Sequence, residues 1–259
     1  MISYPNVKIN LGLHVLRKRP DGFHDLETLF VPCHAFHDTL EITESPLTLP
    51  DGRVDIEIDN CDWDPQKDLT AQAWRLLKAD FPDLPPVRIR MVKGSPVGAG
   101  LGGGSADCAF ALRMIDEMFS LGLSCEDLAS YAARLGSDCA FFIYNTPMFA
   151  TGRGEVLSPF DIDLSRYETR LAIPEGIHVS TREAYGGIIP CDSRPGLKEM
   201  LGTGIENWKD NLVNDFEKTV FAAHPEIAEI KEDMYSQGAV YAAMSGSGSA
   251  VFGLFTKQP

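Results

Sequence analysis

One segment of the sequence combines the residue types and the spacing that phosphate chemistry needs. It runs from Pro96 to Ser105 and has five glycines in the seven positions 98–104. Glycine loses the most conformational entropy on folding, so this density would be costly in a plain connection. Without Cβ atoms, successive backbone N–H groups can converge on an anion, and a helix opening at Ser105 would add its positive end. The loop therefore predicts a phosphate cradle between a strand and a helix.

Other glycine-rich sites match this loop less well. Gly98-Ala-Gly100-Leu-Gly-Gly103 has the GxGxxG spacing of dinucleotide-binding folds, but no strand ending in an acidic residue follows about 20 residues later. The Gly-Lys-Ser/Thr sequence of a Walker A loop is absent. So are the His-Arg-Asp and Asp-Phe-Gly sequences that accompany a protein-kinase loop. A turn without a ligand and a nicotinamide dehydrogenase stay as alternatives.

The elements that must position the loop follow from the apolar periodicity. Alternation predicts strands at 7–15, 39–42, 54–58, 87–91, 169–173, 239–244 and 251–255. Helical spacing predicts helices from an N-cap at Asp68 to near Pro82, from Ser105 through Met118, and over 126–135, 196–202, 212–222 and 226–235. A buried strand is expected at 141–143. Strands and helices in this order predict an α+β protein.

Composition limits the class of protein and its partners. The 259 residues include 37 Asp and Glu against 23 Lys and Arg, a formal charge of −14. Such an acidic surface repels phosphate backbones, so no nucleic-acid partner is expected. The sequence has no uncharged apolar run of about 18 residues and no signal-peptide core, which predicts a cytoplasmic protein with no membrane partner. The six cysteines show no CxxC spacing and are expected to be reduced.

The glycine loop and several motifs outside it carry a family resemblance. Pro96-x-Gly-x-Gly-Leu-Gly-Gly-Gly-Ser105 is similar to the nucleotide loop of the galactose, homoserine, mevalonate and phosphomevalonate kinases, the GHMP superfamily. Lys8-Ile-Asn10 and Met244-Ser-Gly-Ser-Gly-Ser-Ala-Val-Phe252 resemble two further motifs of that superfamily, in the expected order. Five more segments resemble the branch that phosphorylates 4-diphosphocytidyl-2-C-methyl-D-erythritol: 7–13, 19–24, 135–139, 152–155 and 214–217.

The resemblance implies a fold and a reaction. The implied fold is the two-domain GHMP kinase fold, with a ribosomal S5 domain 2-like half over 1–158, a ferredoxin-like half over 159–259, and the active site in the cleft between them. Family members carry one more helix after the strand near Phe255, so a missing last helix is expected. The implied reaction is ATP-dependent phosphorylation of the 2-hydroxyl of that cytidylyl alcohol in the non-mevalonate isoprenoid route. The alternatives are another GHMP small-molecule kinase and a non-catalytic nucleotide sensor.

For catalysis the resemblance implies a pair formed by Lys8 and Asp138. Asp138 would accept the proton of the acceptor hydroxyl, while Lys8 would stabilise the carboxylate and the emerging alkoxide. Without the resemblance, Lys8 is typical of an edge-strand charge and Asp138 of a solvated turn. Mg²⁺ is expected to bridge the β- and γ-phosphate oxygens. Its protein ligands are not assigned, because Ala106 stands where the family has a second serine; Ser105 is a candidate.

The resemblance also implies two groups of binding residues, with a small molecule as partner and a monomer or weak homodimer as the assembly. The ATP-binding group consists of Asp68 near adenine, Lys93 near the loop mouth, and Pro96, Val97, Gly98, Ala99, Gly100, Leu101, Gly102, Gly103, Gly104, Ser105 and Ala106. The substrate-binding group consists of Phe23 and His24 at the cytosine, Thr181 and Tyr185 as a second clamp, Asn10 at the sugar hydroxyls, and Gly246, Ser247 and Gly248 beside the triphosphate. Asp68 as an N-cap only, His24 as a turn residue, and 246–248 as a hairpin turn stay as alternatives.

Overall fold

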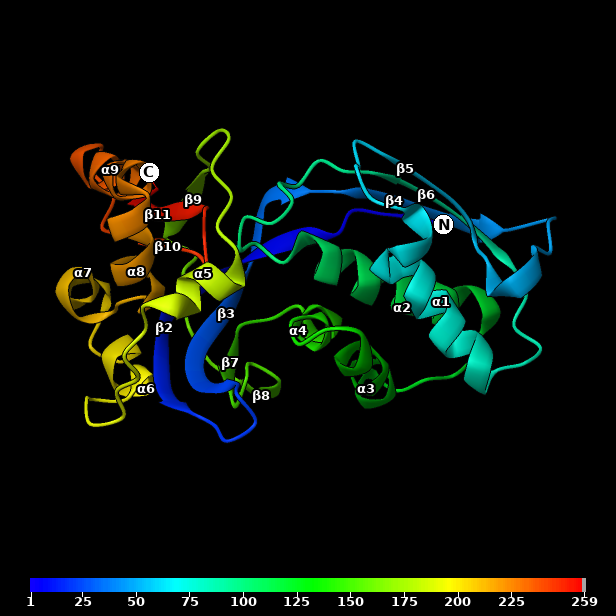
Figure 1. The fold of residues 1–259 in the computed structure, drawn as a ribbon, viewed down its shortest axis with the longest axis horizontal. Coiled ribbons are helices and arrows are strands. Elements are labelled where there is room, and N and C mark those ends of the chain that lie inside the picture. Colours follow the sequence, from blue (N-terminus) through cyan, green and yellow to red (C-terminus); the bar gives the residue numbers. More distant parts are fainter. Residues whose placement is uncertain (258–259) are drawn as a thin grey trace. The chain divides into compact units, whose positions relative to one another are not determined.

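The computed structural model describes residues 1–257, which form two compact units assembled from distant segments (Figure 1). Unit 1 takes residues 1–7, 36–97 and 102–146, and unit 2 takes 8–35, 98–101 and the described residues from 147 on. The first long strand and the glycine loop are therefore each shared by the two units. The boundary between residues 158 and 159, which divides the sequence once, stays a prediction.

Unit 1 is built on a four-stranded sheet with the order β1 (Ile2–Ser3), β4 (Thr39–Glu44), β6 (Val87–Val92) and β5 (Asp55–Asp59). β5 and β6 are parallel, and the other neighbours are antiparallel. Every second residue of β4 and β6 is buried, so the sheet has one apolar face. Helices α1 (Leu69–Asp80) and α2 (Gly103–Phe119) cover that face, and α3 (Cys125–Leu135) and α4 (Cys139–Tyr144) pack against α2 (Figure 1).

Unit 2 contains two sheets and five helices among its described residues. One sheet has the order β2 (Asn6–Lys18), β3 (His24–His37), β7 (Met148–Thr151) and β8 (Val156–Pro159). The other is antiparallel, with the order β10 (Tyr241–Met244), β11 (Val251–Thr256) and β9 (Tyr167–Ala172). The helices are α5 (Thr181–Gly186), α6 (Leu197–Leu201), α7 (Trp208–Asn211), α8 (Phe216–Ala223) and α9 (Pro225–Ser236). Short 3₁₀ turns complete the chain at Pro50–Gly52, Pro65–Lys67 and Ile205–Asn207.

The strand β2 is buried on both faces from Asn6 to Val15. Its odd positions carry the apolar residues that the alternation predicts, and its even positions carry Lys8, Asn10, Gly12 and His14. Gly12 has a φ of +67°, which favours glycine, and a Cβ there would lie 2.5 Å from the side chain of Leu197 on α6. β2 therefore presents a row of polar side chains inside the protein instead of to solvent.

Most predicted elements are present, and the exceptions have a physical cause. The strand expected at 141–143 is wrong, because these residues lie in α4, whose residues Cys139–Ile143 are all buried. A short apolar run with no period does not distinguish a buried strand from a buried helix. The helix after the glycine loop begins at Gly103, before Ser105. Of the helices in residues 1–257, none has the length and apolar character needed to cross a bilayer.

Candidate active site

The glycine loop joins β6 to α2 through three residues in left-handed conformation. Gly98, Gly100 and Gly102 have φ values of +71°, +77° and +73°, which favour glycine. A Cβ on Gly100 would lie 2.2 Å from the carbonyl oxygen of Ser245. Gly100 therefore has both a backbone and a packing reason to be glycine.

Gly104 is explained differently, because it lies in the first turn of α2. An added Cβ would meet no atom of the described residues within 4 Å. Alanine would favour the helix here by about 1 kcal/mol. The open space beside Gly104, at the positive end of a 17-residue helix, fits the approach of a phosphate group.

Lys8 and Asn10 lie in unit 2 beside the first half of the glycine loop. The Nζ of Lys8, a residue only 3% exposed, donates to Asn10 Oδ1 at 2.5 Å and to the Gly100 carbonyl at 2.9 Å. The backbone N–H of Lys8 donates to the Leu101 carbonyl at 2.9 Å. Asn10 donates from Nδ2 to Thr28 Oγ1 on β3 at 2.9 Å. A buried ammonium group is therefore held at the loop by two strands.

The loop after β10 joins the same group of residues. Ser245 Oγ donates to the Gly100 carbonyl at 3.1 Å and lies 3.4 Å from Asn10 Oδ1. Gly246 has a φ of +56°, and a Cβ there would lie 3.4 Å from Lys8 Nζ. The same Cβ would lie 3.1 Å from the Gly100 carbonyl oxygen, so a side chain at this position would crowd the backbone of the glycine loop. The structure thus brings Lys8, Asn10, Gly100 and Gly246, all predicted site residues, together inside unit 2.

Asp138 lies in unit 1 at the N-cap of α4 and is half-buried. The turn before it is tight: the Cys139 N–H donates to the Gly136 carbonyl at 3.2 Å, and a Cβ on Gly136 would lie 3.0 Å from Cys139 Sγ. The same Cβ would lie 4.0 Å from Ser105 Oγ on α2, and Cys108 and Ser105 on α2 lower the pKa of the Cys139 thiol against the effect of burial. The first turn of α2 and the start of α4 are therefore packed together, each with a predicted site residue.

Lys93 is buried in unit 1 between two carboxylates. Its Nζ donates to Asp107 Oδ2 at 2.6 Å and also pairs with Asp38. Asp38 accepts from the backbone N–H groups of Gly94 and Ser95, each at 2.7 Å. We call Asp38, Lys93 and Asp107 the ionic brace. It ties the segment before the glycine loop to the helix after it.

Burial and charge act against each other in the ionic brace. Burial opposes the charge of Lys93, but its two carboxylate partners outweigh burial and raise its pKa. Burial likewise opposes the charge of Asp38, but Lys93 and the N–H donors outweigh it and lower the pKa. Burial raises the pKa of Asp107 well above its usual range, and its Oδ1 lacks a hydrogen-bond partner within residues 1–257. The ammonium of Lys93 is thus engaged inside the unit, and its contact with ATP stays a prediction.

Asp68 is the N-cap of α1. Its Oδ1 accepts from the N–H of Thr70 at 2.9 Å and from the Thr70 hydroxyl at 2.6 Å. Trp63 Nε1 donates to Oδ2 at 3.2 Å. The N-cap role is therefore confirmed, and the approach of Asp68 to adenine stays a prediction.

Two predicted substrate residues meet in unit 2. The rings of His24 and Tyr185 are stacked, with centroids 4.6 Å apart and planes at 20°. Tyr185 also packs against the ring of Phe216 in an edge contact at 4.7 Å. Burial, with a smaller contribution from Lys18, lowers the pKa of His24. A neutral imidazole can both donate and accept a hydrogen bond, as recognition of a base edge requires. Thr181 is exposed in the first turn of the same helix as Tyr185.

Phe23 does not join that stack. Its side chain is 54% exposed, and the guanidinium of Arg153 lies 4.7 Å from its ring centroid. Arg153 sits in a tight turn between Gly152 and Gly154, both with positive φ. The two neighbouring residues that the resemblance assigns to the cytosine therefore make different contacts.

A resident Mg²⁺ site would need oxygen donors. Within residues 1–257, no group of three His, Cys, Asp or Glu side chains is placed to hold a metal ion. Mg²⁺ at nucleotide sites takes several ligands from phosphates and water, so a single protein oxygen suffices. The hydroxyl of Ser105 fits that limited part, and Ala106 has no oxygen to offer.

Comparison with known proteins assigns the family. The model of the GHMP kinases N terminal domain matches residues 68–146, and that of the GHMP kinases C terminal domain matches 195–259. A 4-diphosphocytidyl-2-C-methyl-D-erythritol kinase of Bacteroides fragilis is 49% identical over 261 residues, covering 100% of this chain and 93% of that protein. The chain belongs to the 4-diphosphocytidyl-2-C-methyl-D-erythritol kinase family. The resemblance inferred from the motifs is thereby confirmed.

Solved structures agree with membership of the 4-diphosphocytidyl-2-C-methyl-D-erythritol kinase family. A crystal structure of 4-(cytidine 5'-diphospho)-2C-methyl-D-erythritol kinase is 30% identical with a TM-score of 0.80, covering 98% of this chain and 90% of that one. A homoserine kinase from Cytophaga hutchinsonii is 16% identical with a TM-score of 0.68, covering 98% and 85%, and shares the fold. The predicted α+β GHMP kinase fold is confirmed. As a member of this family, the chain is an ATP-dependent small-molecule kinase, and the dehydrogenase alternative is set aside.

Five residues that build the site have no role predicted from the sequence: Asp38, Asp107, Ser245, Asn214 and Glu217. Of these, Asp107 is the residue that the sequence could most readily have pointed to, because it is a charged residue in the largely apolar first turns of α2. Asn214 and Glu217 were noticed only as a family segment with no assigned role. All five are at most 8% exposed, and a buried polar residue is informative wherever it occurs.

Proposed function

We propose that the chain transfers the γ-phosphoryl group of ATP to the 2-hydroxyl of 4-diphosphocytidyl-2-C-methyl-D-erythritol, giving the 2-phosphate and ADP. The observation that carries this proposal is the grouping of Lys8 and Asn10 with Gly100 and Gly246 in unit 2. A kinase needs a cation and glycine-lined backbone at the same place, because the transferred group bears charge on its oxygens.

In this proposal the glycine loop holds the triphosphate. The N–H groups of the loop and of the first turn of α2 would bind phosphate oxygens, which explains the open space at Gly98 and Gly104. Mg²⁺, when bound, neutralises charge on the β- and γ-phosphates, and Ser105 is the proposed protein ligand. We also assign Asp68 and Lys93 to ATP binding, together with the remaining residues from Pro96 to Ala106.

The chain's own residues then handle the proton. We assign Asp138 as the base that accepts the proton of the 2-hydroxyl, and Lys8 as the cation that stabilises the alkoxide forming there. Asn10, hydrogen-bonded to Lys8 and Thr28, would orient the acceptor's hydroxyl groups. The turn from Gly246 to Gly248 would leave room beside the triphosphate.

The aromatic stack supports a base-containing acceptor. Tyr185 and Phe23 would supply ring faces for a cytosine, and the neutral His24 would bond its edge. Phe23 keeps the ring of the tyrosine usual in the family and lacks its hydroxyl. Thr181, on the same helix as Tyr185, is assigned to this clamp.

We extend the proposal to partners and location. The formal charge of −14 argues against a nucleic-acid partner, so we assign small molecules as the ligands. A cytoplasmic enzyme acting as a monomer or weak homodimer is the accompanying hypothesis, which size-exclusion chromatography with light scattering would test.

The test of the reaction is ADP release with ATP and Mg²⁺ on the cytidylyl alcohol, with mevalonate, homoserine and galactose run in parallel. Turnover on the cytidylyl alcohol alone is expected. Turnover on another of these alcohols would keep the kinase and discard the cytosine assignment. Bound ATP with no turnover on any of the four would favour a nucleotide sensor.

A further inference from the structure

Asn214 uses every hydrogen-bonding group of its side chain within unit 2. Its Nδ2 donates to the carbonyls of Met244 and Gly246, each at 2.8 Å, and its Oδ1 accepts from the N–H of Phe216 at 3.0 Å. Its backbone forms a bridge with Leu13 on β2. Asn214 is 2% exposed, so these bonds form out of contact with solvent.

Glu217 holds the same loop from the first turn of α8. Its Oε1 accepts from the N–H of Met244 at 2.8 Å, and its Oε2 accepts from Lys231 Nζ at 2.7 Å. The residue is 8% exposed. The backbone N–H and the backbone carbonyl of Met244 are therefore both bonded to side chains of the segment 214–217.

The residues that follow Met244 are in turn hydrogen-bonded to the glycine loop. Ser245 Oγ donates to the Gly100 carbonyl at 3.1 Å, and the N–H of Ala250 donates to the Ala99 carbonyl at 3.1 Å. A Cβ on Gly246 would lie 3.1 Å from the Gly100 carbonyl oxygen. The loop 244–250 thus lies against residues 99–100, and segment 214–217 fixes one end of it.

We infer that Asn214 and Glu217 are positioning residues, which together we call the loop tether, and that they set the affinity for ATP by holding the loop 244–250 against the glycine loop. The inference rests on the proposed function in one respect, that the glycine loop binds ATP. Neither residue is assigned to touch substrate.

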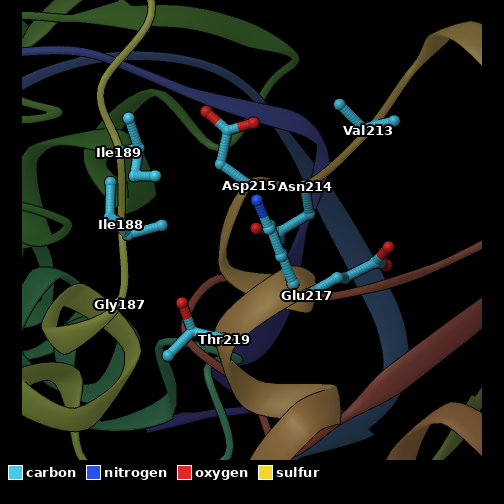
Figure 2. A pocket seen from close by; sticks show the side chains of 9 residues that line it. Gly187, Ile188, Ile189, Val213, Asn214, Asp215, Glu217 and Thr219 are labelled. Atoms are coloured by element: carbon cyan, nitrogen blue, oxygen red, sulfur yellow. The ribbon is translucent and has the colours of Figure 1, made fainter.

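Asn214 and Glu217 also line one wall of a cavity of about 320 Å³, with Ile188 and Ile189 on the opposite wall (Figure 2).

The chemistry of position 214 makes the inference specific. Only a side-chain amide offers two donors and one acceptor at this length. Aspartate has the same shape, but it would turn the two donors into acceptors that face two carbonyl oxygens. Asn214→Asp should therefore release residues 244–246 with no change in volume. Glu217→Gln is milder, because its amide oxygen can still accept from the Met244 N–H while the bond with Lys231 is lost.

The experiment measures the dissociation constant for ATP by calorimetry, and kcat with saturating ATP, in Asn214→Asp, Glu217→Gln and a matched control. The control is Tyr241→Phe, which removes one buried hydrogen bond of unit 2, from the Tyr241 hydroxyl to the Leu212 carbonyl at 2.9 Å, that involves no residue of the loop 244–250. Thermal unfolding is recorded for all three, so that affinities are compared below each melting temperature.

For Asn214→Asp we expect the dissociation constant for ATP to rise at least ~10-fold, and for Glu217→Gln ~3-fold, as the loss of buried hydrogen bonds predicts. Tyr241→Phe should lower the melting temperature and leave the ATP affinity within about twofold. Unchanged affinity in Asn214→Asp would overturn the inference, and so would an equal loss in Tyr241→Phe. If Asn214→Asp does not fold, Glu217→Gln against the control decides. A wild-type chain that binds ATP without phosphorylating the cytidylyl alcohol refutes the proposed function alone, whereas one that binds no ATP refutes both.

Discussion

The two units hold their glycine-rich segments by different chemistry. In unit 1 the ionic brace buries two carboxylates and one ammonium, with Asp38 and Asp107 at most 1% exposed and Lys93 9% exposed. In unit 2 the loop tether uses an uncharged amide with all its bonds made, and a carboxylate paired with Lys231. Buried charges depend on their partners for several kcal/mol, whereas a satisfied amide contributes about 1 kcal/mol per bond. The brace should therefore fail abruptly when its ammonium is removed, and the tether gradually.

The largest effect is expected from Lys93→Met. Removing the ammonium leaves Asp38 and Asp107 as two buried carboxylates with no cation between them. Losing one member of a buried charge group costs roughly 3–5 kcal/mol of unfolding free energy. Urea denaturation at pH 7 measures this loss.

The matched control for Lys93→Met is Asp107→Asn. This variant keeps Lys93 paired with Asp38 and removes the carboxylate that burial disfavours most, whose Oδ1 has no partner among residues 1–257. A smaller loss than in Lys93→Met is expected, because Lys93 keeps Asp38 as its partner and no buried charge is left unpaired. Equal losses in the two variants would show that the brace does not depend on charge balance.

The next effect is the loss of stability at low pH, which we expect to come from His14 in unit 2. His14 on β2 is fully buried, with no hydrogen-bond partner at either ring nitrogen in the described chain. Burial lowers its pKa to about 4, with Arg194 adding to the shift and Asp215 opposing it. Its pKa in the unfolded chain is about 6.5, so between these values the unfolded state binds more protons. The stability contribution is present above pH 6.5 and is lost as the pH falls toward 4.

His14→Phe should remove about 2 kcal/mol of the stability lost between pH 7 and pH 4.5. Unfolding free energies of the wild type and the variant at both pH values measure this difference. A wild-type pH slope unchanged in His14→Phe would move the acid response away from β2, toward carboxylates such as Asp38.

A smaller effect, on the KM for the acceptor, distinguishes residues that position the backbone from residues that contact substrate. His24→Ala removes one ring of the stack with Tyr185 and the proposed partner of the cytosine edge. The KM for the cytidylyl alcohol should rise ~5-fold, as expected for a lost aromatic contact of about 1 kcal/mol. The KM for ATP should not change. A rise in the KM for ATP instead would place His24 with the positioning residues.

The parts of the site that depend on residues close together in the sequence could be predicted from the sequence. The density of glycines predicted the loop between a strand and a helix, where Gly98, Gly100 and Gly102 have positive φ values, and the resemblance to a family motif on an alternating strand pointed to Lys8 and Asn10. Asp68 as N-cap follows from its place before a helical pattern. In each case the prediction depended on a few residues that are neighbours in the sequence.

The parts that were missed depend on pairing across the sequence. Asp38 and Lys93 are 55 positions apart, and Asn214 meets Gly246 across 32 positions, so no spacing rule connects them. The helix α4 was mistaken for a strand because its apolar run has no period of its own. Long-range polar contacts become visible only when the fold places the partners side by side.

The central claim is that Asp138 accepts the proton in the reaction, while the loop tether only holds its loop in place. The most direct test measures kcat on the cytidylyl alcohol and the dissociation constant for ATP in Asp138→Asn. Loss of a general base predicts a kcat at least ~100-fold lower, with ATP affinity within about threefold of wild type. Near-normal turnover in Asp138→Asn would contradict the account and remove Asp138 from the reaction.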